Sequence, residues 1–141
     1  MIWKHTPTLE GINATSKNTL AERLGIEFTT IGDDFLTAKM PVDHRTVQPM
    51  GLLHGGASVA LAETLGSVAS VLCIDDLTKL MPVGVEINAN HLRSATSGFV
   101  YGTARPLRLG RTLHVWNIEI QDEAGKLVCV SRLTVAVVST R

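Results

Sequence analysis

The chain has 141 residues, of which 45% are hydrophobic and 18% are charged, and its 13 basic and 13 acidic residues leave no net charge. This length and composition predict a single folded domain over residues 1–141, with one core, and exclude a disordered chain. The absence of net charge gives no electrostatic case for nucleic acid or an anionic membrane as the main partner.

The sequence also bears on the compartment in which the protein works. Its amino-terminal end has no apolar stretch followed by a small-residue cleavage site, so we expect no secretory signal. No apolar run approaches the roughly 20 residues of a membrane span. We therefore expect a soluble, cytoplasmic protein.

Cysteine and histidine give no sign of a disulfide or a metal site. Cys73 and Cys129 form no CxxC pattern and both have apolar neighbours, which predicts buried thiols. His5, His44 and His114 have no ligand spacing with one another or with a cluster of carboxylates, so solvated or core positions are expected for them.

The first third of the chain is predicted to hold two short helices and a hairpin. The helices cover residues 8–13 and 18–24, and the second is capped by Asn18 and ended by Gly25. β-Branched and aromatic residues then recur over residues 26–31 and 35–40 with a Gly-Asp-Asp turn between them, which indicates a β-hairpin.

A polar loop over residues 41–51, bounded by prolines, leads into one long helix that begins near His54. At about 100° per residue, Glu63 falls opposite the apolar side of this helix. The apolar side carries Leu61, Leu65, Val68 and Leu72. The side of Glu63 carries Gly56, Val59, Gly66, Ser67 and Ser70. One face is therefore predicted to be core and the other to be a site.

Four strands are predicted after the helix, where Asp75, Asp76 and Pro82 break the helical pattern. They cover residues 83–92, 99–107, 112–121 and 126–138. A hairpin, one long helix and then consecutive strands predict an α+β fold with an antiparallel sheet and no βαβ unit. One helix cannot cover so broad a sheet, so we expect the protein to oligomerise.

The long helix carries a candidate oxyanion site and a lone carboxylate. Gly55 and Gly56 open it with no side chain over their backbone N–H groups, which suits an oxyanion. Glu63 is a lone carboxylate with no basic residue three or four positions away, so a catalytic role is favoured over a structural ion pair.

These residues resemble the hotdog-fold acyl-CoA thioesterases of the phenylacetate type. The likeness covers the whole chain and is strongest within the family for thioesterases that hydrolyse 1,4-dihydroxy-2-naphthoyl-CoA in menaquinone synthesis and for their proofreading relatives in enterobactin synthesis. It is carried by the segments Met1–Lys4, Gln48–Gly56, Ala62–Thr64, Glu86–His91 and Pro106–Gly110. Met50, where the family is expected to have an aromatic residue, and Pro82 depart from it.

The resemblance implies a hotdog fold, in which an antiparallel sheet wraps a long central helix, and hydrolysis of an aromatic acyl-CoA without a metal or organic cofactor. It implies that Glu63 attacks the thioester carbonyl or activates water, that Gly55 donates to the oxyanion, and that His54 orients the thioester. Gln48 would contact the carbonyl oxygen or the water, and Ser67 would hold the carboxylate or the water. Met50 would border the acyl group.

The resemblance also places the CoA arm against three short segments. They are Gly84, then His91, Leu92, Arg93 and Ser94, and finally Arg108, Leu109, Gly110 and Arg111. Four arginines, at positions 93, 105, 108 and 111, cluster near two turns, where they could meet CoA phosphates or form an ordinary solvated strand edge.

Three other functions compete with acyl-CoA hydrolysis. A proofreading thioesterase would take the acyl group from the phosphopantetheine arm of an acyl carrier protein. A hotdog dehydratase ranks lower, because the chain lacks the His-Phe-Pro-Gly loop of such enzymes. A non-catalytic acyl-CoA binding protein would not need Glu63.

Distance along the helix predicts a site shared between subunits. Eight residues separate Gly55 from Glu63, which is roughly 12 Å along one helix, whereas one thioester must lie within about 3 Å of both. The two groups are therefore predicted to come from two chains related by a two-fold axis, with their helices antiparallel and in contact through Gly66, Ser67 and Ser70. The resemblance implies a homodimer that pairs again into a homotetramer.

Overall fold

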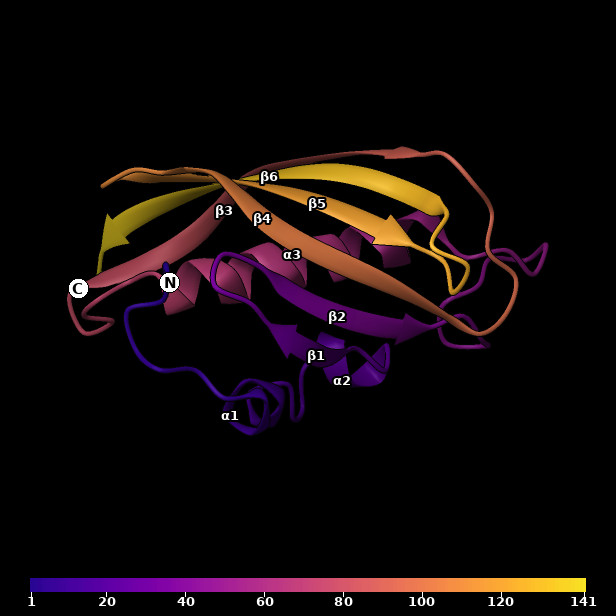
Figure 1. The fold of residues 1–141 in the computed structure, drawn as a ribbon, viewed down its shortest axis with the longest axis horizontal. Coiled ribbons are helices and arrows are strands. Elements are labelled where there is room, and N and C mark those ends of the chain that lie inside the picture. The colour runs from indigo at the N-terminus through magenta and orange to yellow at the C-terminus, as the bar shows by residue number, and fades with distance from the viewer.

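The computed structural model describes all residues 1–141 and consists of a curved sheet wrapped around one long helix (Figure 1). The sheet has six strands in the order β1-β2-β4-β5-β6-β3, and every neighbouring pair is antiparallel. The elements are α1 (Leu9–Ala14), α2 (Leu20–Arg23), β1 (Glu27–Ile31), β2 (Leu36–Pro41), α3 (Gly55–Leu72), β3 (Leu80–His91), β4 (Phe99–Leu109), β5 (Leu113–Gln121) and β6 (Leu127–Ser139). The predicted α+β architecture is confirmed.

The amino-terminal third folds as predicted except at one helix start. β1 and β2 form the expected hairpin, and Gly25, with φ of +73°, ends α2. Asn18 is not the cap of α2. It has φ of +62°, and Thr19 occupies the cap position without a side-chain hydrogen bond. Asn18 instead uses its backbone N–H to reach the Glu22 carboxylate, 3.2 Å away.

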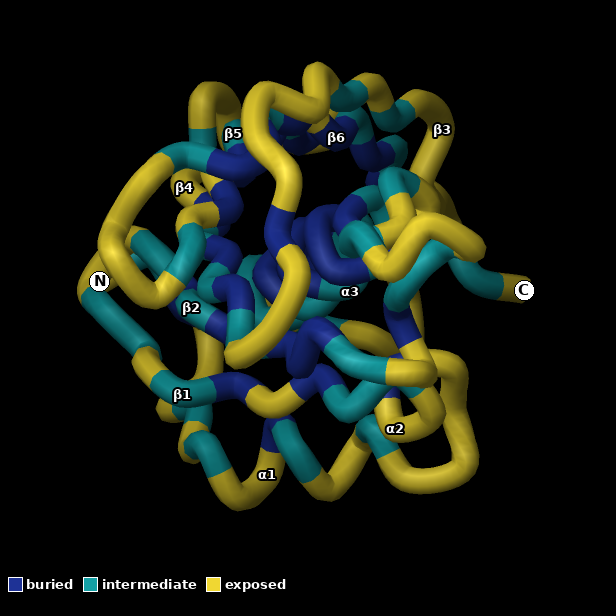
Figure 2. The backbone as a smooth tube through the Cα atoms, turned by 90° about the vertical axis from the view of Figure 1, so that its right-hand side faces the viewer, coloured by how far each residue is buried: buried dark blue, intermediate teal, exposed yellow.

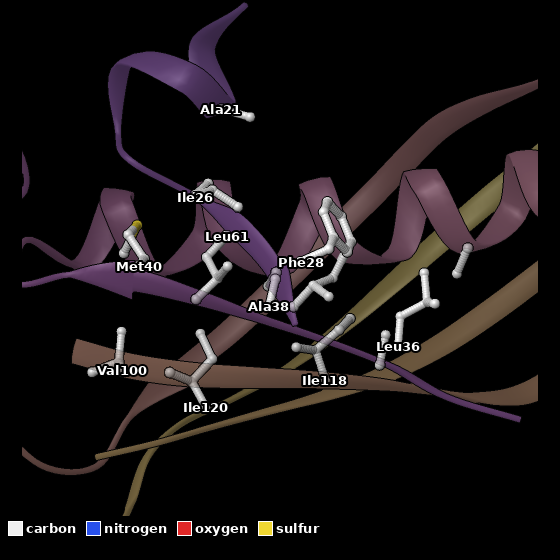
Figure 3. Packing of buried hydrophobic residues seen from close by; sticks show 14 of the residues in the cluster. Ala21, Ile26, Phe28, Leu36, Ala38, Met40, Leu61, Val100, Ile118 and Ile120 are labelled. Atoms are coloured by element: carbon white, nitrogen blue, oxygen red, sulfur yellow. The ribbon is translucent and has the colours of Figure 1, made fainter. Parts of the chain in front are cut away.

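The core lies between the concave face of the sheet and α3 (Figure 3). Leu61 and Leu65 of α3 are fully buried, as the helical spacing predicted. They meet alternating side chains from the strands, because every second residue of a strand faces the helix. Figure 3 shows Leu36, Val100 and Ile118 among these residues.

The predicted division of α3 into two faces is wrong at Gly66 and Ser70. Both residues are buried against the sheet of their own chain. A Cβ on Gly66 would lie only 2.5 Å from a methyl group of Leu133. The curved sheet therefore covers the side of α3 that bears Gly66 and Ser70, and these two residues cannot form a contact with a second helix.

A buried hydrogen-bond network ties α3 to β5. The indole N–H of Trp116 donates to the Ser70 hydroxyl at 2.7 Å, and His114 Nδ1 lies 2.9 Å from the same oxygen. His114 is thus a core residue, as expected from its lack of ligand spacing. Burial lowers the pKa of its imidazole from the ordinary value of 6.5.

β3 begins earlier than predicted and forms an open edge of the sheet. Pro82 does not precede the strand but lies within it, paired with Val137 of β6. An edge strand tolerates proline because its outer N–H groups have no partner strand. Most of this 12-residue strand is exposed, including Met81, Val83 and Val85 (Figure 2).

By length and composition alone α3 could cross a membrane, since it has 18 residues and a mean hydropathy of 1.3. Here it lies under the sheet and carries Glu63 on its outer side. This is the environment of the core helix of a globular domain.

Candidate active site

A pocket of about 280 Å³ opens at the amino-terminal end of α3. It brings together the loop before α3, the first turn of α3 and the end of β3. Gln48, Gly55 and the segment 91–94 all border it, so the structure groups these predicted residues in one place. The full lining is Gln48, Leu52, Leu53, Gly55, Ser58, His91, Leu92, Arg93, Ser94 and Val128.

The start of α3 leaves one backbone N–H free. The His54 carbonyl accepts hydrogen bonds from the N–H groups of Ala57 and Ser58 at 3.0 and 3.2 Å. The His54 side chain accepts one from Gly56 at 2.8 Å. The N–H of Gly55 has no partner in the chain. A helix start with a single unpaired donor in a pocket is suited to hold a developing oxyanion.

Gln48 is held so that its amide can donate into the same pocket. Its side-chain oxygen accepts a hydrogen bond from the N–H of Met50. Gly51, with φ of +80°, closes this turn by donating to the Gln48 carbonyl at 2.9 Å. The Gln48 NH₂ group makes no hydrogen bond within the chain and remains available. Met50 is 81% exposed in the single chain.

The imidazole of His54 lies outside this pocket. Its Nδ1 caps the helix by accepting from Gly56, so a neutral ring carries its proton on Nε2. The ring borders a separate recess that also includes Leu24 and Ala60. The structure thus places His54 beside the predicted oxyanion site but separates its side chain from Gln48 and the Gly55 pocket.

Glu63 stands by itself on the outer side of α3. It is half-buried and makes no hydrogen bond or ion pair within the chain, so no structural partner holds it. Its Oε2 lies 2.9 Å from the position that a Cβ on Gly84 would occupy. Gly84 borders a β-bulge in β3. The carboxylate therefore packs against strand backbone, where only glycine leaves room for it.

Ser67 lies one turn beyond Glu63 and is also half-buried, but no hydrogen bond joins the two side chains. Neither residue borders the pocket of Gln48 and Gly55. A single chain therefore has two separate parts of the predicted site, an oxyanion end and a carboxylate end.

The four arginines do not form one cluster. Arg105 pairs with Asp34 at 3.3 Å and lies 4.5 Å over the ring of Phe35, which gives it a structural role. Arg93 borders the pocket at Gly55. Arg111, with Leu109 and Gly110, borders another recess at the opposite end of α3, and Arg108 is exposed on β4.

Two observations add to the sequence analysis. Ser58, buried at 1% exposure, borders the pocket three residues after Gly55, a position on the same helix face that helical spacing could have identified.

Both cysteine thiols are free, and burial raises the pKa of Cys73 to about 11 and raises that of Cys129 as well. The prediction of buried thiols is confirmed for Cys129, whereas Cys73 is half-buried.

Comparisons with known proteins identify the family of the chain. Residues 50–129 match the pattern that defines the Thioesterase superfamily. The chain is 57% identical over 137 residues to the 1,4-dihydroxy-2-naphthoyl-CoA hydrolase of Escherichia coli, covering 97% of this chain and 99% of the relative. It is also 57% identical over 137 residues to the proofreading thioesterase EntH of Cronobacter turicensis, covering 97% and 98%.

Solved structures show the same similarity. The crystal structure of a mutant thioesterase from Pseudomonas aeruginosa superimposes with a TM-score of 0.97 at 54% identity, covering 99% of this chain and all of that one. A thioesterase from Haemophilus influenzae matches with a TM-score of 0.95 at 52% identity, covering 99% and 96%.

Proposed function

This chain belongs to the Thioesterase superfamily, with the hotdog fold, and from that premise we propose that it hydrolyses aromatic acyl-CoA thioesters resembling 1,4-dihydroxy-2-naphthoyl-CoA to the free acid and CoA. The observation that carries the proposal is a complementary pair of unused groups. Gly55 has a free N–H in a pocket, and Glu63 has a carboxylate without a partner. Thioester hydrolysis needs one such donor and one such base or nucleophile.

In the proposed reaction the Gly55 N–H and the Gln48 amide hold the thioester carbonyl oxygen as it becomes negative. Glu63 either attacks the carbonyl carbon, forming an anhydride that water then hydrolyses, or removes a proton from the attacking water. On either route the C–S bond breaks and its electron pair leaves with the CoA thiolate. Both routes need a charged carboxylate at position 63.

The two ends of the site are proposed to meet across a homodimer. Gly55 and Glu63 lie on one helix, roughly 12 Å apart along its axis, and only Gly55 borders the pocket. Glu63 lies next to β3, the open edge of the sheet, where apolar side chains such as Val83 and Val85 are exposed. Pairing of β3 with its symmetry mate would cover this edge and bring each Glu63 toward the Gly55 of the other chain.

The contact between the helices would then use the half-buried outer stripe of α3. This stripe includes Val59, Glu63 and Ser67, and it excludes Gly66 and Ser70, which are buried. Ser67 would hold the carboxylate or the water once the partner is in place. A second pairing of dimers into a tetramer would cover the remaining sheet surface.

The CoA arm is proposed to enter beside the segment 91–94, which borders the pocket and includes the exposed Arg93. Guanidinium groups bind phosphate with good geometry. The segment 108–111 lies at the far end of α3, so it would reach the same CoA only from a neighbouring chain. Gly84 contributes by leaving room for Glu63.

A second candidate substrate is an aryl group on an acyl carrier protein. The observation that favours it is the equal identity, 57%, to the proofreading thioesterase EntH. CoA and carrier proteins present the thioester on the same phosphopantetheine arm, so the chemistry at Gly55 and Glu63 would be unchanged. The two substrates differ only outside the pocket.

A hydrolysis screen tests the proposal. Naphthoyl-CoA and benzoyl-CoA thioesters, fatty acyl-CoA thioesters and aryl-carrier-protein thioesters are compared by kcat/KM, with the Glu63→Gln variant as the background control. The highest kcat/KM is expected for an aromatic CoA thioester. A preference for the carrier-protein thioester would support the second candidate, and tight acyl-CoA binding with no turnover would refute enzyme function.

A further inference from the structure

The imidazole that reaches the predicted oxyanion site belongs to His91. This residue ends β3 and is paired with Cys129 of β6. The next residue is also hydrogen-bonded to β6, because the N–H of Leu92 donates to the Val128 carbonyl at 2.8 Å. The backbone of His91 is therefore held by the sheet, although its side chain is exposed.

The His91 ring points its Nε2 atom at the start of α3. A Cβ on Gly55 would lie 2.8 Å from Nε2 but 3.2 and 3.3 Å from Cε1 and Cδ2, the two carbons bonded to it. Nε2 is thus the part of the ring nearest to Gly55. Any side chain at position 55 would meet the ring, so the glycine keeps the imidazole close to the free N–H. The ring makes no hydrogen bond within the chain.

In the proposed reaction the oxyanion has two donors, the Gly55 N–H and the Gln48 amide, and a third donor would stabilise it further. Gly56 cannot supply one, because His54 Nδ1 already accepts its N–H. The His91 ring borders the same pocket as Gly55 and Gln48, whereas the His54 ring does not. An imidazole carries an Nε2–H both in its cation and in one of its neutral tautomers.

We propose that His91 Nε2–H donates a hydrogen bond to the thioester oxyanion beside the Gly55 N–H, and that His91 is therefore a catalytic residue. The proposal rests on the proposed function, since it requires the thioester carbonyl to lie in this pocket. It adds a role beyond contact with the CoA arm. No proton needs to be transferred by His91 in the reaction.

The first test separates a role at the carbonyl from a role in binding CoA. His91→Ala and His91→Gln are assayed with an aryl-CoA and with the same aryl group on N-acetylcysteamine, which lacks the nucleotide. His91→Ala should lose about 100-fold in kcat on both substrates, the scale for one oxyanion donor elsewhere. His91→Gln, which keeps an N–H donor, should recover part of the loss.

The control is His44→Ala, which removes an imidazole whose side chain is 88% exposed and does not border the pocket. Its activity should match the wild type, and thermal unfolding should show that all variants are folded. A loss confined to KM for the CoA substrate, or one absent with N-acetylcysteamine, would overturn the catalytic role.

The second test uses the contact between His91 and Gly55. Gly55→Ala keeps the backbone N–H but places a methyl group against the ring, so it should lower kcat. In the His91→Ala background, Gly55→Ala should cause no further loss of kcat. Fully additive losses would show that Gly55→Ala acts on the substrate and not on His91, which would contradict the proposal.

These outcomes are distinct from failure of the proposed function. Absence of wild-type turnover on every thioester would remove the basis of both the proposed function and the role of His91. Turnover that is lost in Glu63→Gln but normal in His91→Ala would reject the role of His91 alone.

Discussion

At the scale of single residues, Glu63 is the group on which the proposed hydrolysis depends most. Glu63→Gln keeps the size of the side chain but removes the charge needed for attack or proton removal. We expect turnover to fall by at least about 100-fold, the low end for general base catalysis. Steady-state kinetics on an aromatic CoA thioester measure this loss of turnover. Near-normal turnover by a folded variant would reject the catalytic role of Glu63.

The environment of that carboxylate gives a second prediction at the same scale. Gly84→Ala would put a methyl group 2.9 Å from Glu63 Oε2 and displace it. The backbone of Gly84 has no positive φ, so alanine adds no backbone strain. We expect kcat to fall about tenfold or more, since small misplacements of a reacting group are costly.

The control for Gly84→Ala is the double variant with Glu63→Gln. If the methyl group acts through the carboxylate, the double variant should be no less active than Glu63→Gln alone. An added loss would show that Gly84 contacts the substrate directly.

At the scale of elements, the helix and strands were predictable from sequence periodicity, but their surroundings were not. Alternating apolar residues placed β4, β5 and β6 within one or two residues of their bounds. The face of α3 that bears Gly66 and Ser70 was misassigned, because their partners Leu133 and Trp116 come from strands more than 40 residues away. A helical wheel contains no information on how far a sheet curves.

The candidate site was predictable only in part for the same reason. The glycines that open α3 and the isolated Glu63 could be identified from local sequence. The approach of His91 to Gly55 depends on where β3 ends relative to α3, which only the folded chain determines. The unexpected separation of the His54 ring from the pocket follows from its hydrogen bond to Gly56, a competing local use of the same side chain.

The link between α3 and β5 predicts a dependence of stability on pH. Burial lowers the pKa of His114 in the folded chain from 6.5, so the unfolded chain binds this proton more readily. The contribution of uncharged His114 to the free energy of unfolding is fully present above pH 6.5. It is lost as the pH falls toward the lower pKa that His114 has in the folded chain. The free energy of unfolding should decrease by at most about 1.4 kcal/mol per pH unit from this group.

Urea unfolding of the wild type and of His114→Asn between pH 7.5 and 5 measures this effect. Asparagine can still donate to Ser70 but does not titrate. The variant should show a shallower decline in the free energy of unfolding on the acidic side. Identical pH slopes in the two proteins would show that His114 does not cause the decline.

At the scale of the whole molecule, the proposed function makes one chain an incomplete enzyme. Its oxyanion end and its carboxylate end lie on one helix but cannot meet on one thioester, and the strand beside Glu63 is an open, partly apolar edge. A two-fold dimer in which β3 and α3 each pair with their counterparts would complete two sites and cover that edge. The proposed function therefore predicts that the active species is at least a dimer.

Complementation between inactive chains tests this central claim most directly. One chain carries Glu63→Gln, and the other carries Gln48→Ala with Gly55→Pro, a substitution that removes the N–H at a helix position where proline is tolerated. The two proteins are unfolded, mixed in equal amounts and refolded, and subunit exchange is confirmed by mass spectrometry. Half of the dimers should be mixed with one intact site each, so activity should return to about a quarter of the wild-type value. Mixed dimers without activity, or an active monomer by light scattering, would contradict the shared site.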